Sequence, residues 1–354
     1  MRFGLFFLLE KPENGNDAQV YADTMEQIKL ADELGYDYIW LAEHRFTRYG
    51  IAPDVLVLAA AAASITKRVR IGTAVVVLPF HDPILLAEQV AMVDVISNGR
   101  FDFGAGRGYQ AGEFKGLGIP MDESRSRFEE VMDICVGLWT NDRFSYEGKH
   151  YTVDDISLEP KPIQKPHPPI WVTAMQTPST FTYAAERGYG IISGNPYQAD
   201  PEFHKAYLVY QETLEKIGRP ELAKNFWALA PTFVHHDSAQ ALEIPRESAL
   251  SYQEAFVRYG TPRQADGSLP KGYESYDQGW DGARANIGYL DTVVDSPNFL
   301  VGDIGQVKSR LHANGKIGMN DFIVWMNRGG AIPQKAVLDS MELFAKEVMP
   351  EFKS

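Results

Sequence analysis

Three glycines stand at every second position in the segment 104–110, and Arg107 lies between the last two of them. Glycine lets a backbone approach a ligand closely, and an arginine can bind a phosphate through two parallel hydrogen bonds. The segment therefore fits a phosphate-bearing ligand, although a flexible turn with a surface arginine would carry the same residues. A dinucleotide-binding Rossmann motif needs Gly-x-Gly-x-x-Gly directly after the first strand. Here the third glycine comes one position early, after the fourth expected strand, so a Rossmann fold is not expected.

A helix is expected to begin at Thr177-Pro178-Ser179-Thr180, and its first turn is a second candidate anion site. Free backbone N–H groups and the positive end of the helix dipole favour an anion there, and the hydroxyls of Ser179 and Thr180 can donate to it. Simple capping by Thr177, with Pro178 in the first turn, explains the same residues without a ligand. Because this turn and Arg107 follow neighbouring strands, we favour one shared phosphate site.

His44 directly follows the second expected strand and stands next to Glu43. A histidine there can move a proton near neutral pH or donate a hydrogen bond to a bound oxygen, and Glu43 can orient it or sit behind it. Alternatively, His44 is a packed side chain bonded to nearby backbone. A metal site needs further ligands, and His81 and the pair His235-His236 are isolated from His44 in the sequence. We therefore expect no metal.

The elements that must position these residues follow from hydrophobic periodicity, in which buried apolar runs alternate with helical spacing. Strand–helix alternation forces parallel pairing, and eight such strands favour a closed (β/α)8 barrel with its active site at the C-terminal ends of the strands. The expected strands are 2–9, 38–41, 69–78, 100–104, 170–174, 190–193, 227–234 and 322–326. The expected helices are 17–34, 53–64, 83–96, 124–139, 178–187, 201–217 and 333–348.

Two stretches exceed what a minimal barrel needs. Residues 141–168 predict a small hairpin, with strands at 144–146 and 151–153, followed by a proline-rich return. Residues 259–298 are rich in Gly, Pro, Asp and Tyr, and a long segment without periodicity is typical of a lid over an active site. Since no linker separates independent parts, we expect one domain over residues 1–354.

The composition is that of a globular protein, with 45% hydrophobic and 23% charged residues. No apolar run approaches the roughly 20 residues that span a bilayer, and the N-terminus lacks a signal-peptide pattern, so a cytoplasmic location is expected. The net charge of −13 argues against nucleic acid and membrane surfaces as partners. The single cysteine, Cys135, lies within a helical pattern and is expected to be a buried, inert thiol.

Several motifs, in the same order, make the chain resemble the bacterial luciferase-like, flavin-dependent monooxygenases, and the luciferase catalytic subunit in particular. The similarity covers nearly the whole chain. The motifs that carry it are Phe3-Gly4, Trp40-Leu41-Ala42-Glu43-His44-Arg45-Phe46, Gly72-Thr73-Ala74-Val75-Val76-Val77-Leu78-Pro79, Gly99-Arg100-Phe101-Asp102-Phe103-Gly104 with Arg107-Gly108, and Val348-Met349-Pro350.

The resemblance implies a (β/α)8 barrel with an FMN site in which Arg107 binds the phosphate. It also implies a non-prolyl cis peptide between Ala74 and Val75, beneath the isoalloxazine ring. His44 matches the family's catalytic histidine, and Glu113 matches an acidic position near the flavin. The expected cofactor-binding residues are Arg107, Ala74, Val75, Met175 and Gln176 (through their backbone), Ser179, Thr180 and Glu113.

The substrate side departs from luciferase at three positions. Gly106 replaces a cysteine, which is expected to enlarge the pocket, Arg45 replaces a second histidine, and Gly194 replaces a tryptophan. These changes argue against light emission and against a long-chain aldehyde substrate. We expect Gly106, Tyr109, Gly194 and Phe6 to line the substrate pocket.

The resemblance implies a two-component monooxygenase. A separate NAD(P)H-dependent flavin reductase would deliver FMNH2, which reacts with O2 to a C4a-hydroperoxide that oxygenates a small organic substrate. His44 would stabilise the peroxide or move a proton, with Glu43 behind it. The alternatives are a deazaflavin (F420)-dependent reductase or dehydrogenase and a non-catalytic flavin-binding subunit. A homodimer or higher oligomer is expected, with the alanine-rich helix 53–64 allowing close helix approach.

Overall fold

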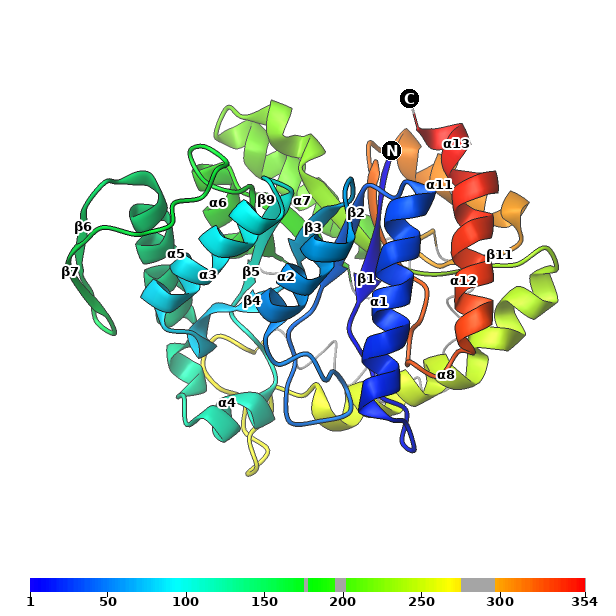
Figure 1. Ribbon diagram of the computed structural model, residues 1–354, viewed down its shortest axis with the longest axis horizontal. Helices are drawn as coiled ribbons and strands as arrows, with labels where there is room; N and C mark the ends of the chain where they lie inside the picture. Colours follow the sequence, from blue (N-terminus) through cyan, green and yellow to red (C-terminus); the bar gives the residue numbers. More distant parts are fainter. Residues whose placement is uncertain (175–177, 195–201, 275–296, 354) are drawn as a thin grey trace.

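The computed structural model describes residues 1–174, 178–194, 202–274 and 297–353. Within these residues, eight parallel strands close into a barrel, because the last strand pairs with both the seventh and the first. The expected (β/α)8 barrel is therefore confirmed (Figure 1). In barrel order its strands are β1 (Arg2–Phe7), β2 (Tyr38–Leu41), β3 (Arg70–Thr73), β5 (Phe101–Gly106), β8 (Ile170–Thr173), β9 (Gly190–Ser193), β10 (Phe226–Val234) and β12 (Asp321–Trp325).

The helices surround the barrel, and polar side chains fix the starts of several of them. The side chains of Asn16, Asp54 and Asp82 accept hydrogen bonds from the first free backbone N–H groups of their helices, which is the usual role of an N-cap. The helices are α1 (Asp17–Leu34), α2 (Val55–Ile65), α3 (Pro83–Ile96), α4 (Ala111–Leu117), α5 (Ser124–Thr140), α6 (Pro178–Arg187), α7 (Glu202–Lys216), α8 (Ser238–Tyr259), α11 (Ile304–Lys316), α12 (Gln334–Leu343) and α13 (Met349–Phe352).

The third expected strand, 69–78, is interrupted. It divides into β3 and a short strand β4 (Val76–Val77). The peptide bond between Ala74 and Val75, which lies between them, is cis, as the resemblance implied. The hydroxyl of Thr73 donates to the carbonyl of Gly104 at 2.7 Å and accepts from its N–H at 2.8 Å, which ties the end of β3 to β5. A Cβ at Gly104 would lie 1.7 Å from the carbonyl oxygen of Thr73, so only glycine fits this approach.

The region between the last two barrel strands contains elements that the sequence pattern did not predict. The 22-residue helix α8 carries Pro245 in its interior, and β11 (Leu300–Gly302) extends the sheet beside β10 before α11 begins. A proline inside a helix removes one backbone hydrogen bond, so the pattern around it resembles a loop. Of the expected lid 259–298, residues 275–296 lie outside the described residues.

The expected hairpin is confirmed as β6 (Phe144–Glu147) paired antiparallel with β7 (Thr152–Ile156). The carboxylate of Glu130 on α5 accepts three hydrogen bonds, from the backbone N–H groups of Lys149, His150 and Tyr151. Cys135 on the same helix is fully buried, and this burial raises the pKa of its thiol. The hairpin is therefore attached to α5, away from the strand ends that carry His44 and Arg107.

Large aromatic rings fill the barrel. Trp40, Trp171 and Trp227 pack edge to face, with ring centroids 5.3 to 6.3 Å apart. Trp40 and Trp171 each have a glycine beside them on an adjacent strand: a Cβ at Gly72 would lie 2.3 Å from Trp40, and one at Gly190 would lie 2.2 Å from Trp171. The interior is thus a packed core rather than a pore, as is usual for this architecture.

Ion pairs close the N-terminal end of the barrel. Arg2 at the start of β1 binds Asp321 at the start of β12, and Arg70 at the start of β3 binds Asp102 on β5. At the opposite end, the apolar side chains nearest the C-terminal ends of the strands remain partly exposed. They are Phe6, Ala74, Val75 and Leu229. A ligand therefore meets an apolar surface at the C-terminal ends of the strands.

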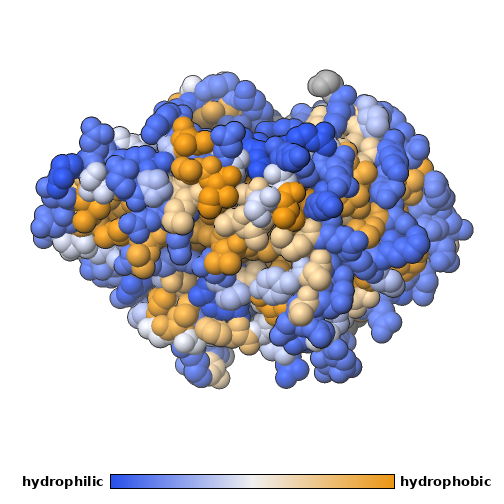
Figure 2. All heavy atoms as spheres, in the orientation of Figure 1, coloured by the Kyte–Doolittle hydropathy of each residue, from blue (hydrophilic) through white to orange (hydrophobic). Residues whose placement is uncertain are grey.

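An apolar surface patch covers the adjacent helices α2 and α3, where Figure 2 shows hydrophobic side chains gathered on the outside of the barrel. The most exposed large apolar side chains of this patch are Val57, Ile65, Leu85, Met92, Val95 and Ile96.

None of the described helices is both long and apolar enough to cross a membrane.

Candidate active site

His44 is held at the barrel mouth by a carboxylate and two aromatic rings. Its Nδ1 lies 3.1 Å from Oε1 of Glu113, which is only 2% exposed and also accepts the backbone N–H of Arg45 at 2.9 Å. The His44 ring packs edge-on against Tyr49, with centroids 4.8 Å apart. Because a carboxylate only accepts hydrogen bonds, this geometry favours a proton on Nδ1 and leaves Nε2 as the reactive nitrogen.

Gln110 is the second polar side chain beside His44, with its amide nitrogen 3.2 Å from the same Nδ1. This amide can donate to Nδ1 only in the tautomer with the proton on Nε2, so the Gln110 contact and the Glu113 bond belong to different tautomers of the ring. Gln110 stands at the N-cap position of the short helix α4, which carries Glu113, so one segment supplies both polar partners. The resemblance placed Glu113 near the flavin but gave it no contact with His44. No pattern in the sequence indicated Gln110.

Glu43 does not contact His44, contrary to the expectation that it orients this ring. Its carboxylate accepts the backbone N–H of Val77 at 2.9 Å, lies 2.9 Å from Nε2 of His81, and pairs with the guanidinium of Arg45. Consecutive residues of an extended segment point in opposite directions, so Glu43 and His44 face different sides of the backbone. Glu43 therefore lies in a buried charge cluster beneath the mouth.

The cis peptide forms a shelf, which we define as the segment Ala74–Val77. The backbone N–H of Ala74 donates to Leu41 at 2.7 Å, and the carbonyl of Val75 accepts the N–H of Glu43 at 3.3 Å. With the side-chain bond from Glu43 to Val77, these contacts fix the shelf to the end of β2. Ala74 and Val75 are partly exposed and rest on the aromatic core, so they offer a flat apolar surface.

A second group of residues forms what we call the phosphate corner: Arg107, Ser124, Arg125, Ser179 and Tyr273. Arg107 donates to the carbonyl of Gly272 at 2.6 Å and lies over the Tyr273 ring at 4.1 Å. The Tyr273 hydroxyl is bonded to Ser124 at 3.0 Å, and Arg125 donates to Ser179 at 3.1 Å. Arg125 thus contacts the first turn of α6, and Arg107 is linked to this group through Tyr273.

The phosphate corner unites Arg107 and Ser179, the residues expected from neighbouring strands. Thr180 lies in the same turn and is partly buried, while Met175 and Gln176 lie outside the described residues. Arg125 is an addition that no motif indicated. Its sequence signal was weak, because the spacing to Glu129 also fits an ordinary ion pair along a helix surface, which the structure indeed contains.

Two of the departures from luciferase do not open space. A Cβ at Gly106 would lie 2.5 Å from a methyl group of Val75, so the valine occupies the room that a side chain would take. The expected enlargement of the pocket at Gly106 is therefore wrong. Gly194 has a φ of +145°, and a Cβ there would lie 2.7 Å from Leu229, so this backbone excludes a larger residue. The third departure, Arg45, faces Glu43 rather than the mouth.

Aromatic side chains continue from His44 across the mouth, and we call Phe6, Tyr49, Tyr109, Tyr252 and Trp325 the aromatic wall. The Tyr49 hydroxyl lies 3.1 Å from that of Tyr109 and 3.0 Å from that of Tyr252. Tyr252 packs edge-on against Trp325 at 4.7 Å, and Trp325 against Phe6 at 5.2 Å. Burial raises the pKa of Tyr49 well above its ordinary value, so its hydroxyl stays neutral. Phe6 and Tyr109 thus belong to the same aromatic surface as His44, and their place in a substrate pocket stays a prediction.

Among the described residues, no group of three or more His, Cys, Asp or Glu side chains could hold a metal ion. The polar groups that do converge at the mouth suit a phosphate, a planar ring and a proton-transfer step.

Comparison with known proteins identifies the family. The model of the luciferase-like monooxygenases matches residues 1–321. The chain belongs to the luciferase-like monooxygenase family. Among its family relatives, the oxygenase component of a flavin-dependent trigonelline monooxygenase from Acinetobacter baylyi is 29% identical, covering 99% of this chain and 96% of the relative. An alkanal monooxygenase alpha chain from Photorhabdus luminescens is 27% identical over 100% of this chain and 97% of its own length.

Solved structures of other proteins share the fold along the whole chain. The monooxygenase RslO1 from Streptomyces bottropensis superposes with a TM-score of 0.84 at 27% identity, with 100% of both chains covered. The oxygenating constituent of 3,6-diketocamphane monooxygenase from Pseudomonas putida, solved with FMN, gives 0.82 at 22% identity, covering 100% and 99%. An F420-dependent secondary alcohol dehydrogenase gives 0.74 at 18% identity over 100% and 99%. The last two likenesses show the fold alone.

Proposed function

We propose that this chain is the oxygenase component of a two-component monooxygenase that uses reduced FMN and O2 to oxygenate a small organic substrate. The observation that carries the proposal is the shelf at Ala74–Val75, which is bonded through Val75 to Glu43 beside His44 and lies against the segment in which Gly106 and Gly108 flank Arg107. The relatives named as flavin-dependent monooxygenases support the same reading.

The residues present fit FMN. The shelf offers an apolar surface for a planar ring, and the glycines after β5 let the backbone come close to it. A Cβ at Gly108 would lie 2.7 Å from Val77, so a side chain there would disturb the shelf. Arg107 and Arg125 supply bidentate donors for a phosphate, and Ser179 lies in the first turn of α6, where backbone N–H groups favour an anion.

When bound, reduced FMN would supply the two electrons needed to reduce O2 so that one oxygen atom enters the substrate and the other leaves as water. The chain supplies position, exclusion of water and proton control. His44, with its Nδ1 proton held by Glu113, would use Nε2 to stabilise the reacting oxygen or to transfer a proton. Glu43 fixes the shelf through Val77 instead of acting on His44.

The partners we propose are a flavin reductase and a second copy of the chain. An oxygenase component needs a separate source of reduced flavin, which an NAD(P)H-dependent reductase would provide. The exposed apolar patch on α2 and α3 supports self-association through these helices, because patches of this kind usually mark an interface. We propose that the chain acts in the cytoplasm as a single barrel domain.

The alternatives are an F420-dependent reductase or dehydrogenase, since that cofactor occurs on the same fold, and a non-catalytic flavin-binding subunit. An anaerobic titration with reduced FMN and with reduced F420 separates the cofactors. We expect saturable binding of FMN in preference to F420. Oxygen uptake with a flavin reductase and candidate substrates then tests catalysis. Preference for F420, or FMN binding without substrate-dependent product in any assay, would favour an alternative.

A further inference from the structure

The shelf packs on the part of the barrel core that contains three tryptophans, Trp40, Trp171 and Trp227. Trp40 lies beside Gly72, two residues before the shelf begins. The centroid of the Trp40 ring lies 5.3 Å from that of Trp227 and 5.9 Å from that of Trp171, and the rings meet edge to face. A flat cofactor on the shelf is therefore separated from connected indole rings by one layer of aliphatic side chains.

The three indole N–H groups differ in their partners. Trp171 donates from Nε1 to Oδ2 of Asp102 at 2.8 Å. Within the described part of the chain, the buried Nε1 atoms of Trp40 and Trp227 have no hydrogen-bond partner. Trp227 also lies 5.0 Å from the guanidinium of Arg2, and a positive charge makes removal of an electron harder. Loss of one electron makes an indole N–H strongly acidic, so the oxidised ring is stabilised where a base takes up the proton, as at Trp171.

Asp102 is suited to accept that proton. It is fully buried, and burial raises the pKa of its carboxyl although Arg70 opposes this shift. Arg70 donates from Nε to Oδ1 at 2.8 Å, whereas Trp171 binds the other oxygen, Oδ2. The Tyr38 hydroxyl also lies near Oδ2, but at 3.4 Å, so Trp171 has the stronger hydrogen bond to this oxygen.

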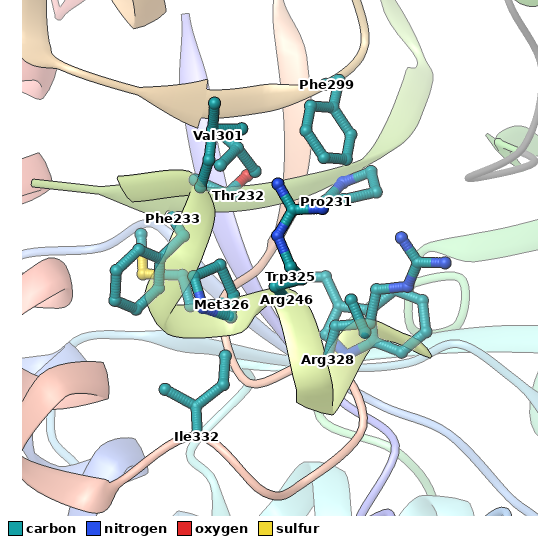
Figure 3. A pocket seen from close by; sticks show the side chains of 13 residues that line it. Pro231, Thr232, Phe233, Arg246, Phe299, Val301, Trp325, Met326, Arg328 and Ile332 are labelled. Atoms are coloured by element: carbon teal, nitrogen blue, oxygen red, sulfur yellow. The ribbon is translucent and has the colours of Figure 1, made fainter. Parts of the chain in front are cut away.

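A fourth tryptophan, Trp325, is not one of these three. It packs on Phe6 and Tyr252 in the aromatic wall and lines a hollow beside α8, where Figure 3 shows it with Met326 and Arg328. The guanidinium of Arg328 lies 5.7 Å from its ring, so removal of an electron from Trp325 is harder than from Trp40. The core therefore contains the better electron donor.

We propose that the barrel core donates electrons to a flavin on the shelf, with Trp40 as the first donor and Trp171 as the final one. One electron passes from Trp40 to an oxidised flavin that blue light has excited, and Trp171 then supplies one electron to Trp40. The Nε1 proton of Trp171 passes to Oδ2 of Asp102, which leaves a neutral indole radical. Return of the electron and the proton restores the starting state. This inference rests on the proposed function for the place of FMN on the shelf, and it adds a light-driven reaction to oxygenation.

The test is laser-flash absorption spectroscopy of the full-length protein loaded with oxidised FMN, which separates a neutral tryptophan radical from its protonated form. We expect the neutral radical, together with quenched fluorescence of the bound FMN. Trp40→Phe should lose the radical and increase the fluorescence. Trp171→Phe and Asp102→Asn should form only the protonated radical, with a lifetime at least about tenfold shorter, because no base takes up its proton.

Trp139→Phe is the matched control, since it removes a buried tryptophan on α5 whose Nε1 donates to the carbonyl of Ala87. The radical and its lifetime should stay unchanged in this variant. Asp102→Asn also breaks the pair with Arg70, whereas Trp171→Phe keeps that pair, so Trp171→Phe decides the result if Asp102→Asn does not fold. A thermal melt checks the folding of each variant.

The proposal is overturned if bound FMN yields no tryptophan radical, if Trp40→Phe keeps the radical, or if Trp325→Phe loses it instead. Oxygenation without a radical would overturn this inference alone. Radical formation without oxygenation in any assay would contradict the proposed function alone, and absence of saturable FMN binding would overturn both.

Discussion

Glu113 is the carboxylate that holds His44, with Oε1 at 3.1 Å from Nδ1 and a second bond from the backbone N–H of Arg45. Glu43, next to His44 in the chain, instead holds the shelf through Val77. Glu113 therefore holds the proton of His44, whereas Glu43 fixes the shelf on which the cofactor is proposed to lie.

Replacing Glu113 with Gln should lower turnover about 10- to 100-fold at saturating FMN, because a charge-assisted hydrogen bond to the histidine is lost. FMN affinity should stay close to that of the parent chain. Glu130→Gln is the matched control, since it alters another buried carboxylate, which accepts its hydrogen bonds from the backbone of the hairpin. Equal losses in both variants would indicate a general structural effect and remove Glu113 from the mechanism.

Replacing Glu43 with Gln should lower stability and FMN affinity and leave turnover nearly unchanged. The neutral side chain no longer balances Arg45, and breaking a buried ion pair by changing one partner typically costs about 3–5 kcal/mol in the free energy of unfolding. We expect a lower melting temperature and weaker FMN binding, with near-normal turnover once FMN is saturating. If turnover is lost while FMN affinity is preserved, Glu43 acts on His44 after all.

Arg125→Ala should weaken FMN binding about 10- to 100-fold, as loss of an ionic hydrogen bond to phosphate predicts, and Arg107→Ala should do the same. Riboflavin, which has the same ring without the phosphate, provides the control ligand. Its affinity should be unchanged in both variants. A variant that loses FMN and riboflavin binding equally would show that the arginine supports the fold or the ring instead of the phosphate.

Glu10 should make stability depend on pH. Burial raises the pKa of its carboxyl to about 8, although Gly329 and Arg328 oppose this shift. The folded chain then keeps a proton that the unfolded chain releases above its ordinary pKa of 4.5. The stabilising effect is full below that value and is lost as pH rises toward 8, at up to about 1.4 kcal/mol per pH unit.

The Glu10→Gln variant has no proton to lose at this position. Its free energy of unfolding relative to the parent chain should therefore rise between about pH 4.5 and pH 8 and level off above pH 8. Urea unfolding between about pH 5 and pH 9 measures the difference. A constant difference across this range would contradict the assignment of a raised pKa to Glu10.

Much of the architecture could be predicted, because buried parallel strands leave continuous apolar runs and their helices leave 3.6-residue spacing. The region around α8 could not, since Pro245 interrupts the periodicity and the long connection to β12 hides a paired strand, β11. The site divides in the same way. His44 and Arg107 follow strands directly, so their place at the mouth follows from the fold alone.

The partners of these residues were harder to predict, because they depend on side-chain direction and on distant segments. Adjacency in sequence suggested Glu43 for His44, but alternation along an extended segment turns the two apart. Glu113 and Gln110 reach His44 from the start of α4, about 70 residues away in the chain. Val75, from the neighbouring segment, fills the space above Gly106. A comparison of motifs position by position cannot show such a contact between two segments.

The most direct test of the account is substrate-free reoxidation of reduced FMN. Reduced FMN bound to the protein without oxygen is mixed with O2, and the return of oxidised FMN is followed by its absorbance. We expect oxidised FMN to return much more slowly than from free reduced FMN in buffer, and to return faster in His44→Ala than in the parent chain, with FMN affinity unchanged. Reoxidation by the parent chain at the rate of free FMN would contradict the central claim that this mouth shields and controls flavin-bound oxygen.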